Sequence, residues 1–306
     1  MKAAAYCALC IIWGTTWLVI RAGMLGTGPI TSAGARFLIA GLILYAVAAW
    51  RGVPRRWSDI PVPLVLVLAI FGFIFDYGLI YVAEAHIDSG IVALLFGSTT
   101  LFTCLFSRIM LSETIGRSTV VGLTLAMAGL LVIGISRQVA VSPLFAGAAI
   151  LAAACSAFSN VYAKQFRADP LISLPPAMTA AGILMLGLGL LLEPLDLRTA
   201  LSAESLGALV YLAIAGSAVA FFLLLWLIDR LPAVFIGLMA IPIRLIALAF
   251  GVILGGEHLD IPILTGTALS TVGLALALVP LEGLEKTLSL IGRPGGAARP
   301  WPSENS

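Results

Sequence analysis

The sequence predicts an all-α membrane protein of about ten transmembrane helices in two inverted five-helix repeats. Three observations support this fold class. The chain has 306 residues, of which 61% are hydrophobic and 10% charged, whereas a soluble domain carries about 25% charged residues. Long apolar runs succeed one another along the chain, and positions 144 residues apart match one another. The polar residues are too few to cover the surface of the folded chain, so we expect lipid to surround it.

The apolar runs define the expected helices. A membrane-spanning helix needs roughly 20 predominantly apolar residues, and short segments rich in glycine, proline and charge separate the runs. The expected helices are 3–21, 31–50, 62–83, 88–108, 117–136, 143–163, 172–192, 205–227, 233–254 and 261–281. Since Arg21 follows the first run and no small-residue cleavage pattern stands out, we expect a retained helix there and not a signal peptide.

The repeat is clearest where the fourth and ninth helices end, at Ser112-Glu113 and at Gly256-Glu257, whose glutamates lie 144 positions apart. The same interval relates Leu94 with Leu238, Leu111 with Gly255, Gly122 with Gly266 and Gly129 with Gly273. We therefore predict repeats at residues 1–138 and 139–282, followed by a disordered cytoplasmic tail at 283–306. Five helices is an odd number, so the second repeat must be inverted relative to the first.

The basic residues predict the orientation, because Lys and Arg gather in cytoplasmic loops. With the N-terminus inside, the cytoplasmic side holds Lys2, Arg51, Arg55, Arg56, Arg108, Arg117, Lys164, Arg167, Arg230, Lys286, Arg293 and Arg299. The outside holds Arg21, Arg137 and Arg198, with Arg36 near the outer margin of the second helix. This asymmetry predicts an inner-membrane, multi-pass protein with both termini in the cytoplasm.

Two charges lie at membrane depth. Asp76 follows Pro61 by 15 residues and Arg244 follows Pro232 by 12, on helices that run in the same direction. At 1.5 Å per residue their depths are roughly 22 and 18 Å, so the side chains can meet. A charge at a helix centre costs about 2.5–3.5 kcal/mol on insertion scales, and usually faces a bundle interior or a wet cavity. A substrate or coupling site and a purely structural ion pair both remain open.

Aromatic and polar side chains extend this candidate site. Trp13 and Trp17 are four residues apart, as are Tyr77 and Tyr81, so each pair shares a helix face. The predicted substrate-binding or coupling residues are Asp76, Arg244, Tyr77, Tyr81, Trp13, Trp17, Thr16, Asn160, Thr99 and Thr100. Thr16 corresponds to Asn160 under the 144-residue shift, and Ser156 shares a face with Asn160. Taken singly, each is also explained as a helix-packing contact or an interfacial anchor.

We expect structural roles for the remaining charged and sulfur-containing residues. We expect Glu84, Asp88, Glu193, Asp229 and Lys164 to reach the interface or cap helices, and Glu113 and Glu257 to stabilise turns. His86 and His258 fall in predicted outer loops, and the four cysteines fall in apolar runs. The sequence contains no HExxH, GxSxG or GxxxxGK[ST] motif. We therefore predict no catalytic residue, metal, cofactor or nucleic-acid partner.

Several short motifs carry a resemblance to a known family. They are Trp13-Gly14-Thr15-Thr16-Trp17, Ala35-Arg36-Phe37 with Ala40, Leu111-Ser112-Glu113, and Leu254-Gly255-Gly256-Glu257 followed by Gly266 and Gly273. In their order and spacing, over residues 1 to about 281, the chain resembles the drug/metabolite transporter superfamily and, within it, the EamA-type exporters. The resemblance implies ten helices in two inverted halves and a central cavity lined by helices 1, 3, 4, 6, 8 and 9. Two departures are Thr99-Thr100, where many relatives have proline, and Arg244 after Pro242 in the ninth helix.

The predicted function is export of a small polar or amphipathic metabolite, such as an amino acid, by alternating access. Because no ATP-binding motif is present, energy is expected from an ion gradient, with protons as the candidate. An importer or facilitator of the same fold is the first alternative, and an intramembrane enzyme or receptor is a minor one. The lipid bilayer and a small-molecule substrate are the expected partners. Substrate identity, direction, coupling ion and oligomeric state stay open.

Overall fold

The computed structural model describes residues 2–53, 60–87, 89–113, 115–136, 142–166, 169–239, 242–243, 246, 250 and 261–278. Within these ranges the chain is helical and contains no strand. The single helices are α1 (Lys2–Gly23), α2 (Pro29–Trp50), α5 (Ser89–Phe96), α6 (Thr99–Leu111), α7 (Arg117–Ser136), α8 (Pro143–Phe166), α9 (Pro170–Leu192), α10 (Leu197–Ala200), α13 (Ala233–Leu238) and α15 (Ile261–Leu278).

Two further helices are composite, because each contains a π-helical segment. The first consists of α3 (Val62–Val67), the π-helical segment η2 (Leu68–Phe75) and α4 (Asp76–His86). The second consists of α11 (Ala203–Ala213), the π-helical segment η3 (Ile214–Val219) and α12 (Ala220–Ile228). The two segments end 144 positions apart, at Phe75 and Val219, and π-helical turns are frequent at functional sites.

Five helices are long and apolar enough to cross a membrane: 29–50, 62–86, 143–166, 170–192 and 203–228. The expected fourth run is divided into α5 and α6, and the expected ninth run at 233–254 lies mostly outside the described residues. The helices α1, α7 and α15 fall on predicted runs, whereas the short α10 lies between the predicted runs 172–192 and 205–227. The all-helical membrane fold class is therefore confirmed.

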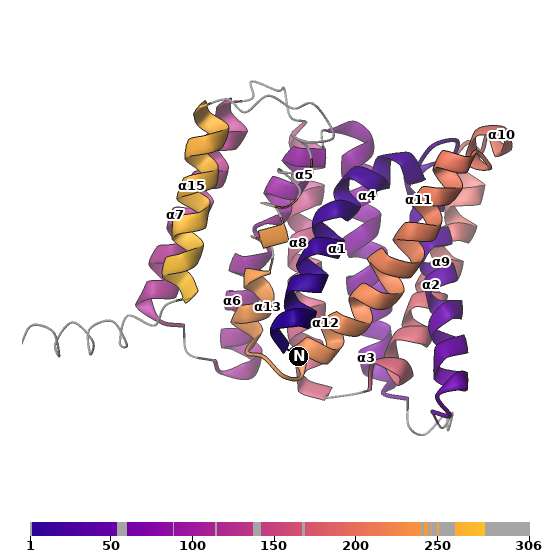
Figure 1. The fold of residues 1–306 in the computed structure, drawn as a ribbon, viewed down its shortest axis with the longest axis horizontal. Helices are drawn as coiled ribbons and strands as arrows, with labels where there is room; N and C mark the ends of the chain where they lie inside the picture. The colour runs from indigo at the N-terminus through magenta and orange to yellow at the C-terminus, as the bar shows by residue number, and fades with distance from the viewer. Residues whose placement is uncertain are drawn as a thin grey trace, which may run out of the picture.

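Close helix pairs form the two ends of the bundle (Figure 1). At one end α2 packs along α9, and at the other α7 packs along α15. Between them lie α1, α4, α8, α12 and α13. The N-terminus lies beside the connection between α12 and α13 (Figure 1), where Lys2 Nζ donates to the Arg230 carbonyl at 3.3 Å. We call this side of the molecule the N-terminal face.

Glycines permit the close approach within both pairs. A Cβ at Gly34 of α2 would lie 2.3 Å from the Leu186 backbone nitrogen, and one at Gly182 of α9 would lie 2.3 Å from the Leu38 nitrogen. Between α7 and α15, a Cβ at Gly122 would lie 2.3 Å from the Gly273 carbonyl oxygen. Such backbone contact is the usual basis of helix association in lipid, where apolar surface alone gives little driving force.

A carboxylate from the second half of the chain caps the start of α2. Glu193 accepts hydrogen bonds from the Ile30 and Thr31 backbone nitrogens, both at 2.8 Å, and from the Thr31 hydroxyl at 2.7 Å. These nitrogens belong to the first helical turn, which has no partners within the helix. The expectation that Glu193 caps a helix is therefore confirmed, although the helix is distant in sequence.

The backbone conformation of Ser112 explains why a small residue precedes Glu113. It ends α6 in the left-handed conformation with φ 54°, which side chains disfavour by roughly 1–2 kcal/mol. Its backbone nitrogen and that of Glu113 both donate to the Ser107 carbonyl, which closes the end of the helix. A small residue tolerates this conformation best, and the turn directs Glu113 toward α13.

Candidate functional site

A central cavity lies between the composite helices, α1 and α8. It provides about 80 Å³ of space for the centres of water-sized molecules, which is room for several waters or part of a small solute. Its described wall contains Trp13, Thr16, Trp17, Asp76, Tyr77, Thr99 and Asn160, all from the predicted set. It also contains residues that the prediction left out, among them Phe73, Phe96, Ser159 and Phe221.

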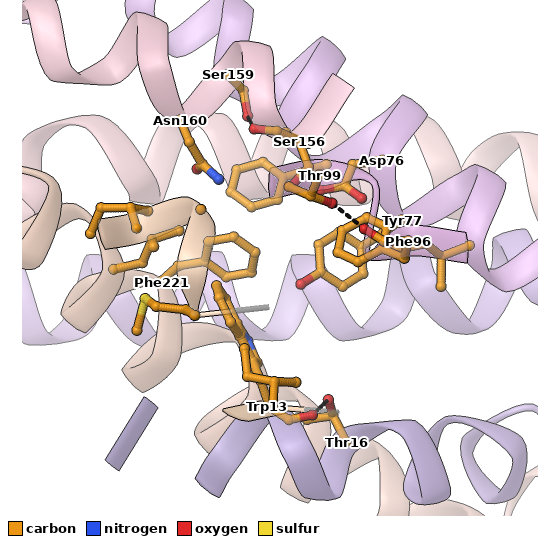
Figure 2. Close-up of a pocket in the computed structure, with 18 of the residues that line it drawn as sticks. Trp13, Thr16, Asp76, Tyr77, Phe96, Thr99, Ser156, Ser159, Asn160 and Phe221 are labelled. Carbon is orange, nitrogen blue, oxygen red and sulfur yellow. Dashed lines mark hydrogen bonds between the residues drawn. The ribbon is translucent and has the colours of Figure 1, made fainter. Parts of the chain in front are cut away.

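Asp76 is the one charged residue among the described lining residues. It is the first residue of α4, directly after η2, and is only 3% exposed. Ser156 of α8 lies beside its carboxyl group (Figure 2), while Asp76 Oδ1 has no hydrogen-bond partner in the described part of the protein. A buried carboxylate oxygen without a partner is costly, so this atom is poised to accept a proton or a donor group from a ligand.

Aromatic rings from four helices, α1, α4, α5 and α12, surround the space next to this carboxylate. Tyr77 and Phe221 meet edge to face with ring centroids 5.7 Å apart, and Trp13 and Phe221 do so at 5.5 Å. Trp17 contacts Phe96 at 5.9 Å. Rings in this arrangement give a ligand's apolar body a large contact area and can also hold a cation over a ring face.

The polar groups lie mainly on α8. Ser156, Ser159 and Asn160 occupy the same side of the cavity as Asp76, across from Trp13 and Thr16 of α1 (Figure 2). The hydroxyls of Thr16 and Ser159 donate to the carbonyls of Trp13 and Ser156 in their own helices, at 2.8 and 3.0 Å. The cavity therefore combines a group of polar side chains near Asp76 with aromatic rings on several sides.

Equivalent positions of the two halves meet at this cavity. Five pairs of lining residues are 144 positions apart: Thr16 with Asn160, Tyr77 with Phe221, Ile80 with Leu224, Ala93 with Gly237, and Thr99 with Ile243. Shifting the predicted site residue Tyr77 by this interval would have identified Phe221 from sequence. Phe73 and Ser159 have no such signal, because an apolar Phe and an isolated Ser are ordinary in membrane helices.

Three predicted site residues are not on the described cavity wall. Tyr81 is completely buried behind it. Thr100 points toward the ninth helix and donates to the Gly237 carbonyl at 2.9 Å, so it joins α6 to α13. Arg244 lies outside the described residues, as does the Asp76–Arg244 contact expected from their depths.

Two charged residues are buried in the bundle. Arg36, predicted near the outer margin of the second helix, is 1% exposed. Its side chain points into the bundle, where backbone and hydroxyl oxygens accept its hydrogen bonds. Glu84, expected at the interface, is also buried at 1% exposure.

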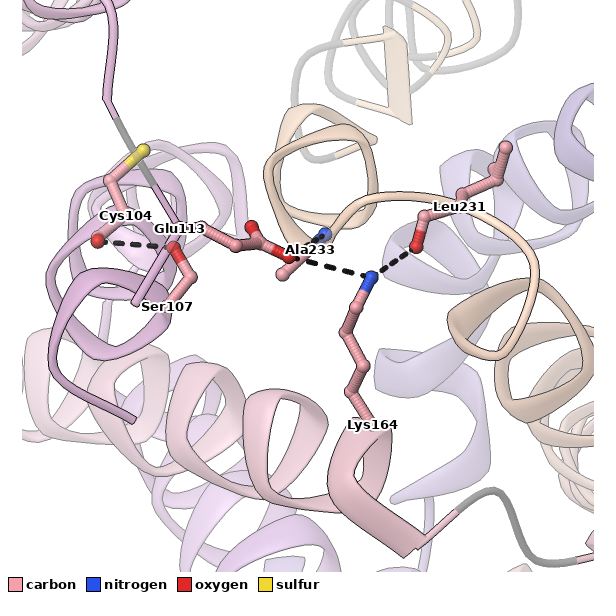
Figure 3. A network of polar contacts seen from close by, with 6 residues as sticks. All are labelled: Cys104, Ser107, Glu113, Lys164, Leu231 and Ala233. Atoms are coloured by element: carbon pink, nitrogen blue, oxygen red, sulfur yellow. Dashed lines mark hydrogen bonds and ion pairs between the residues drawn. The ribbon is translucent and has the colours of Figure 1, made fainter. Parts of the chain in front are cut away.

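A polar network joins α8 to the connection between α12 and α13 (Figure 3). Lys164 Nζ lies 3.6 Å from Glu113 Oε1 and also donates to the Leu231 carbonyl. The same glutamate oxygen accepts from the Ala233 nitrogen at 3.4 Å. A smaller pocket beside Lys164 shares Asn160 and Ile236 with the cavity and has no space for the centre of a water molecule. The network therefore binds α6, α8 and the start of α13 together.

The apolar helices and the amphipathic cavity between them are typical of the class of polytopic membrane transporters. The family model of the EamA-like transporter family matches residues 2–135 and 144–279. The chain therefore belongs to the EamA-like transporter family, and the resemblance noted in its sequence is confirmed.

Individual relatives agree with this membership. The chain is 31% identical over 287 residues to the "Uncharacterized inner membrane transporter YedA" of Escherichia coli K12, covering 90% of this chain and 89% of that protein. It is 26% identical over 280 residues to the "Uncharacterized transporter YoaV" of Bacillus subtilis, covering 86% and 92%. One solved crystal structure matches with a TM-score of 0.76 at 20% identity, over 93% of this chain and 98% of that chain, so the two share a fold.

Proposed function

We propose that this protein is a secondary transporter that exports a small polar or amphipathic metabolite by alternating access. The observation that carries the proposal is the cavity lined by aromatic rings and polar side chains, with the Asp76 oxygen that has no partner in the described part of the protein. A buried charge beside a cavity in a membrane protein usually marks a substrate or ion pathway. The family supports transport in general, and the cavity suggests which solutes fit.

The proposal includes ten helices in two inverted five-helix repeats, at residues 1–138 and 139–282, followed by a tail at 283–306. The family model supports it by matching once in each half, as do the π-helical segments that end 144 positions apart. Further support comes from Gly122, which contacts Gly273, and Gly129, which contacts Gly266, because these are exchanged pairs of the repeat. Two similar inverted bundles can exchange conformations, so that the cavity opens to one face and then to the other.

The solute we propose carries a protonated amine and an apolar body, as amino acids and related amines do. An ammonium group would supply the hydrogen bond that Asp76 Oδ1 lacks, and the apolar body would lie against Trp13, Tyr77 and Phe221. A charge-assisted hydrogen bond of this kind contributes about 1.5–3 kcal/mol. A proton on Asp76 would compete with the ammonium group, which provides a means of coupling to a proton gradient. Arg244 remains the proposed partner for a substrate carboxylate.

The proposed location is the inner membrane with both termini in the cytoplasm. It is supported by the distribution of Lys and Arg in the sequence and by the inner-membrane description of YedA. The N-terminal face would then be the cytoplasmic side, and the Lys164–Glu113 network would close that side of the cavity.

A ligand screen tests the proposed function. Purified protein is heated with amino acids, amines and nucleosides, and solutes that raise the melting temperature are then tested for movement across proteoliposomes in both directions. A ligand at 100 times its Kd stabilises the folded state by about 2.7 kcal/mol, so we expect amine-bearing solutes with apolar bodies to raise the melting temperature. The proposal fails if no solute that binds is moved, or if bound solutes are chemically converted without movement.

Loss of the Lys164 amine is expected to open the N-terminal face. In K164Q the ion pair with Glu113 and the charged hydrogen bond to the Leu231 carbonyl are both absent, so α13 is held to α8 less firmly. The measurement is labelling of a cysteine at buried Thr103, which lines the small pocket beside Lys164, by a membrane-impermeant maleimide. The natural cysteines are first replaced by serine.

We expect K164Q to accelerate this labelling severalfold when the reagent is applied from the N-terminal face. R230Q is the matched control. Arg230 is an exposed cation that directly precedes Leu231, and it donates to the nearby Trp226 carbonyl at 2.9 Å and not to another helix. Equal labelling rates in K164Q, R230Q and the parent protein would show that the network does not close this face.

A further inference from the structure

Arg36 is a fully buried cation that does not line the cavity. All three of its nitrogens donate hydrogen bonds: Nε to Ser217 Oγ at 2.7 Å, Nη1 to the Tyr81 hydroxyl at 3.2 Å, and Nη2 to the Gly216 carbonyl at 3.0 Å. The acceptors belong to η3 and α4, whereas Arg36 belongs to α2. One guanidinium group therefore joins three helices drawn from both halves of the chain.

The same guanidinium contacts an aromatic residue of the cavity wall. Arg36 Cζ lies 4.9 Å from the centroid of the Tyr77 ring and 5.4 Å from that of Phe37. Phe37 meets Tyr77 edge to face, with centroids 4.9 Å apart. The Tyr77 ring is thus held from behind by a cation and an aromatic edge, while it also lines the cavity.

Arg36 also acts on a second wall residue through one shared carbonyl. The Gly216 carbonyl accepts from Arg36 Nη2 and from Trp13 Nε1, the latter at 3.3 Å. It belongs to the π-helical segment η3, whose wider turn changes the direction of its carbonyls relative to an α-helix. A Cβ at position 216 would lie 3.0 Å from Thr16 Cγ2 and 3.2 Å from Arg36 Nη2. Glycine therefore leaves the space in which these groups meet.

We propose that Arg36 is a positioning residue that sets the separation of Trp13 and Tyr77, and thereby selects the apolar body of the transported solute. This inference rests on the proposed function, because it concerns the same cavity. Arg36 does not bind the solute itself, since its nitrogens already donate to Ser217, Tyr81 and Gly216 and it is absent from the described wall. Its planar fork and its stacking on Tyr77 are the properties that matter.

Arg36→Lys separates this role from a charge role. Lysine keeps the positive charge but cannot donate to three separate acceptors in fixed directions or stack as a plane on Tyr77. We expect R36K to lower the preference for an aromatic over a small aliphatic amine, for example phenethylamine over propylamine, by at least about fivefold in kcat/KM. Most of that change should be in KM for the aromatic amine. Ser217→Ala, which removes one acceptor, is expected to change the preference in the same direction by a smaller factor.

Trp13 fluorescence can be measured without any solute, so it tests this inference separately from the proposed function. A variant retains Trp13 and replaces with phenylalanine the other five tryptophans, Trp17, Trp50, Trp57, Trp226 and Trp301. In this background we expect R36K to shift the emission maximum and increase acrylamide quenching, because the Trp13 ring loses its fixed place. Ser173→Ala is the control, since Ser173 is equally buried but bonds within α9 to the Asp169 carbonyl.

A changed preference together with a changed Trp13 signal supports the inference, and a changed Trp13 signal supports it even where no solute is transported. An unchanged Trp13 signal in folded R36K overturns it. So does equal loss of transport for both amines without a change in preference, because that result would give Arg36 a general structural role.

Discussion

Asp76→Asn is expected to reduce kcat/KM for an amine-bearing solute by about 10- to 100-fold. Asparagine preserves the shape of the side chain but removes the charge, so a charge-assisted hydrogen bond of about 1.5–3 kcal/mol is lost. The substituted residue still lies beside Ser156 at the start of α4, so the cavity should keep its form. Uptake and exchange of labelled solute in proteoliposomes measure the change.

The pH dependence of the same variant tests the coupling role. If Asp76 couples proton movement to solute transport, D76N should no longer accumulate solute in response to a proton gradient. It should still exchange solute on one side of the membrane for solute on the other. Asp229→Asn is the matched control, because Asp229 is an exposed carboxylate at the end of α12. A transport rate and pH profile equal to those of the parent protein would show that Asp76 takes part in neither substrate binding nor proton coupling.

Gly182→Ala is expected to cost about 1–3 kcal/mol of stability or more, and to reduce the yield of monodisperse protein. The added methyl group would lie 2.3 Å from the Leu38 nitrogen and 2.7 Å from the Leu38 Cα. These are backbone atoms of α2, so relief requires the two helices to separate along their length. The melting temperature in detergent and the size-exclusion profile measure the effect.

Gly187→Ala provides an internal control on the same helix. Gly187 faces outward, and a Cβ there would have no atom within 4 Å. Alanine is favoured over glycine in a helix by about 1 kcal/mol, so this variant should match or exceed the parent protein in stability. Equal destabilisation by both substitutions would show that close α2–α9 packing does not govern stability.

The positions of the helices and the position of Asp76 well inside one of them could be predicted because both follow from one-dimensional patterns. Long apolar runs specify spanning helices, and a rise of 1.5 Å per residue places each residue along its axis. The 144-residue interval likewise relates Thr16 to Asn160, and both line the cavity. Family membership followed from the order of short motifs, which the family model then matched in both halves.

Which side of each helix faces the cavity could not be predicted from the same patterns. In a membrane protein, lipid and protein interior are both apolar, so on most helices no polar stripe distinguishes the faces. The helix α8 is an exception, because Ser156 and Asn160 share a face and both line the cavity. Tyr77 and Tyr81 therefore looked equivalent, yet Tyr77 lines the cavity and Tyr81 accepts a hydrogen bond from Arg36 behind it. Thr99 and Thr100 are separated in the same way, because Thr100 bonds to the Gly237 carbonyl.

Helix placement, the repeat interval and the presence of a carboxylate well inside a long apolar helix could thus be predicted from the amino-acid order alone, because each depends on position along the chain. The inward direction of Arg36, the cap that Glu193 places on α2, and the Lys164–Glu113 ion pair emerged only in three dimensions. These contacts join residues more than 50 positions apart in the chain. Long side chains reach such partners only after packing has fixed the distance and rotation of the helices.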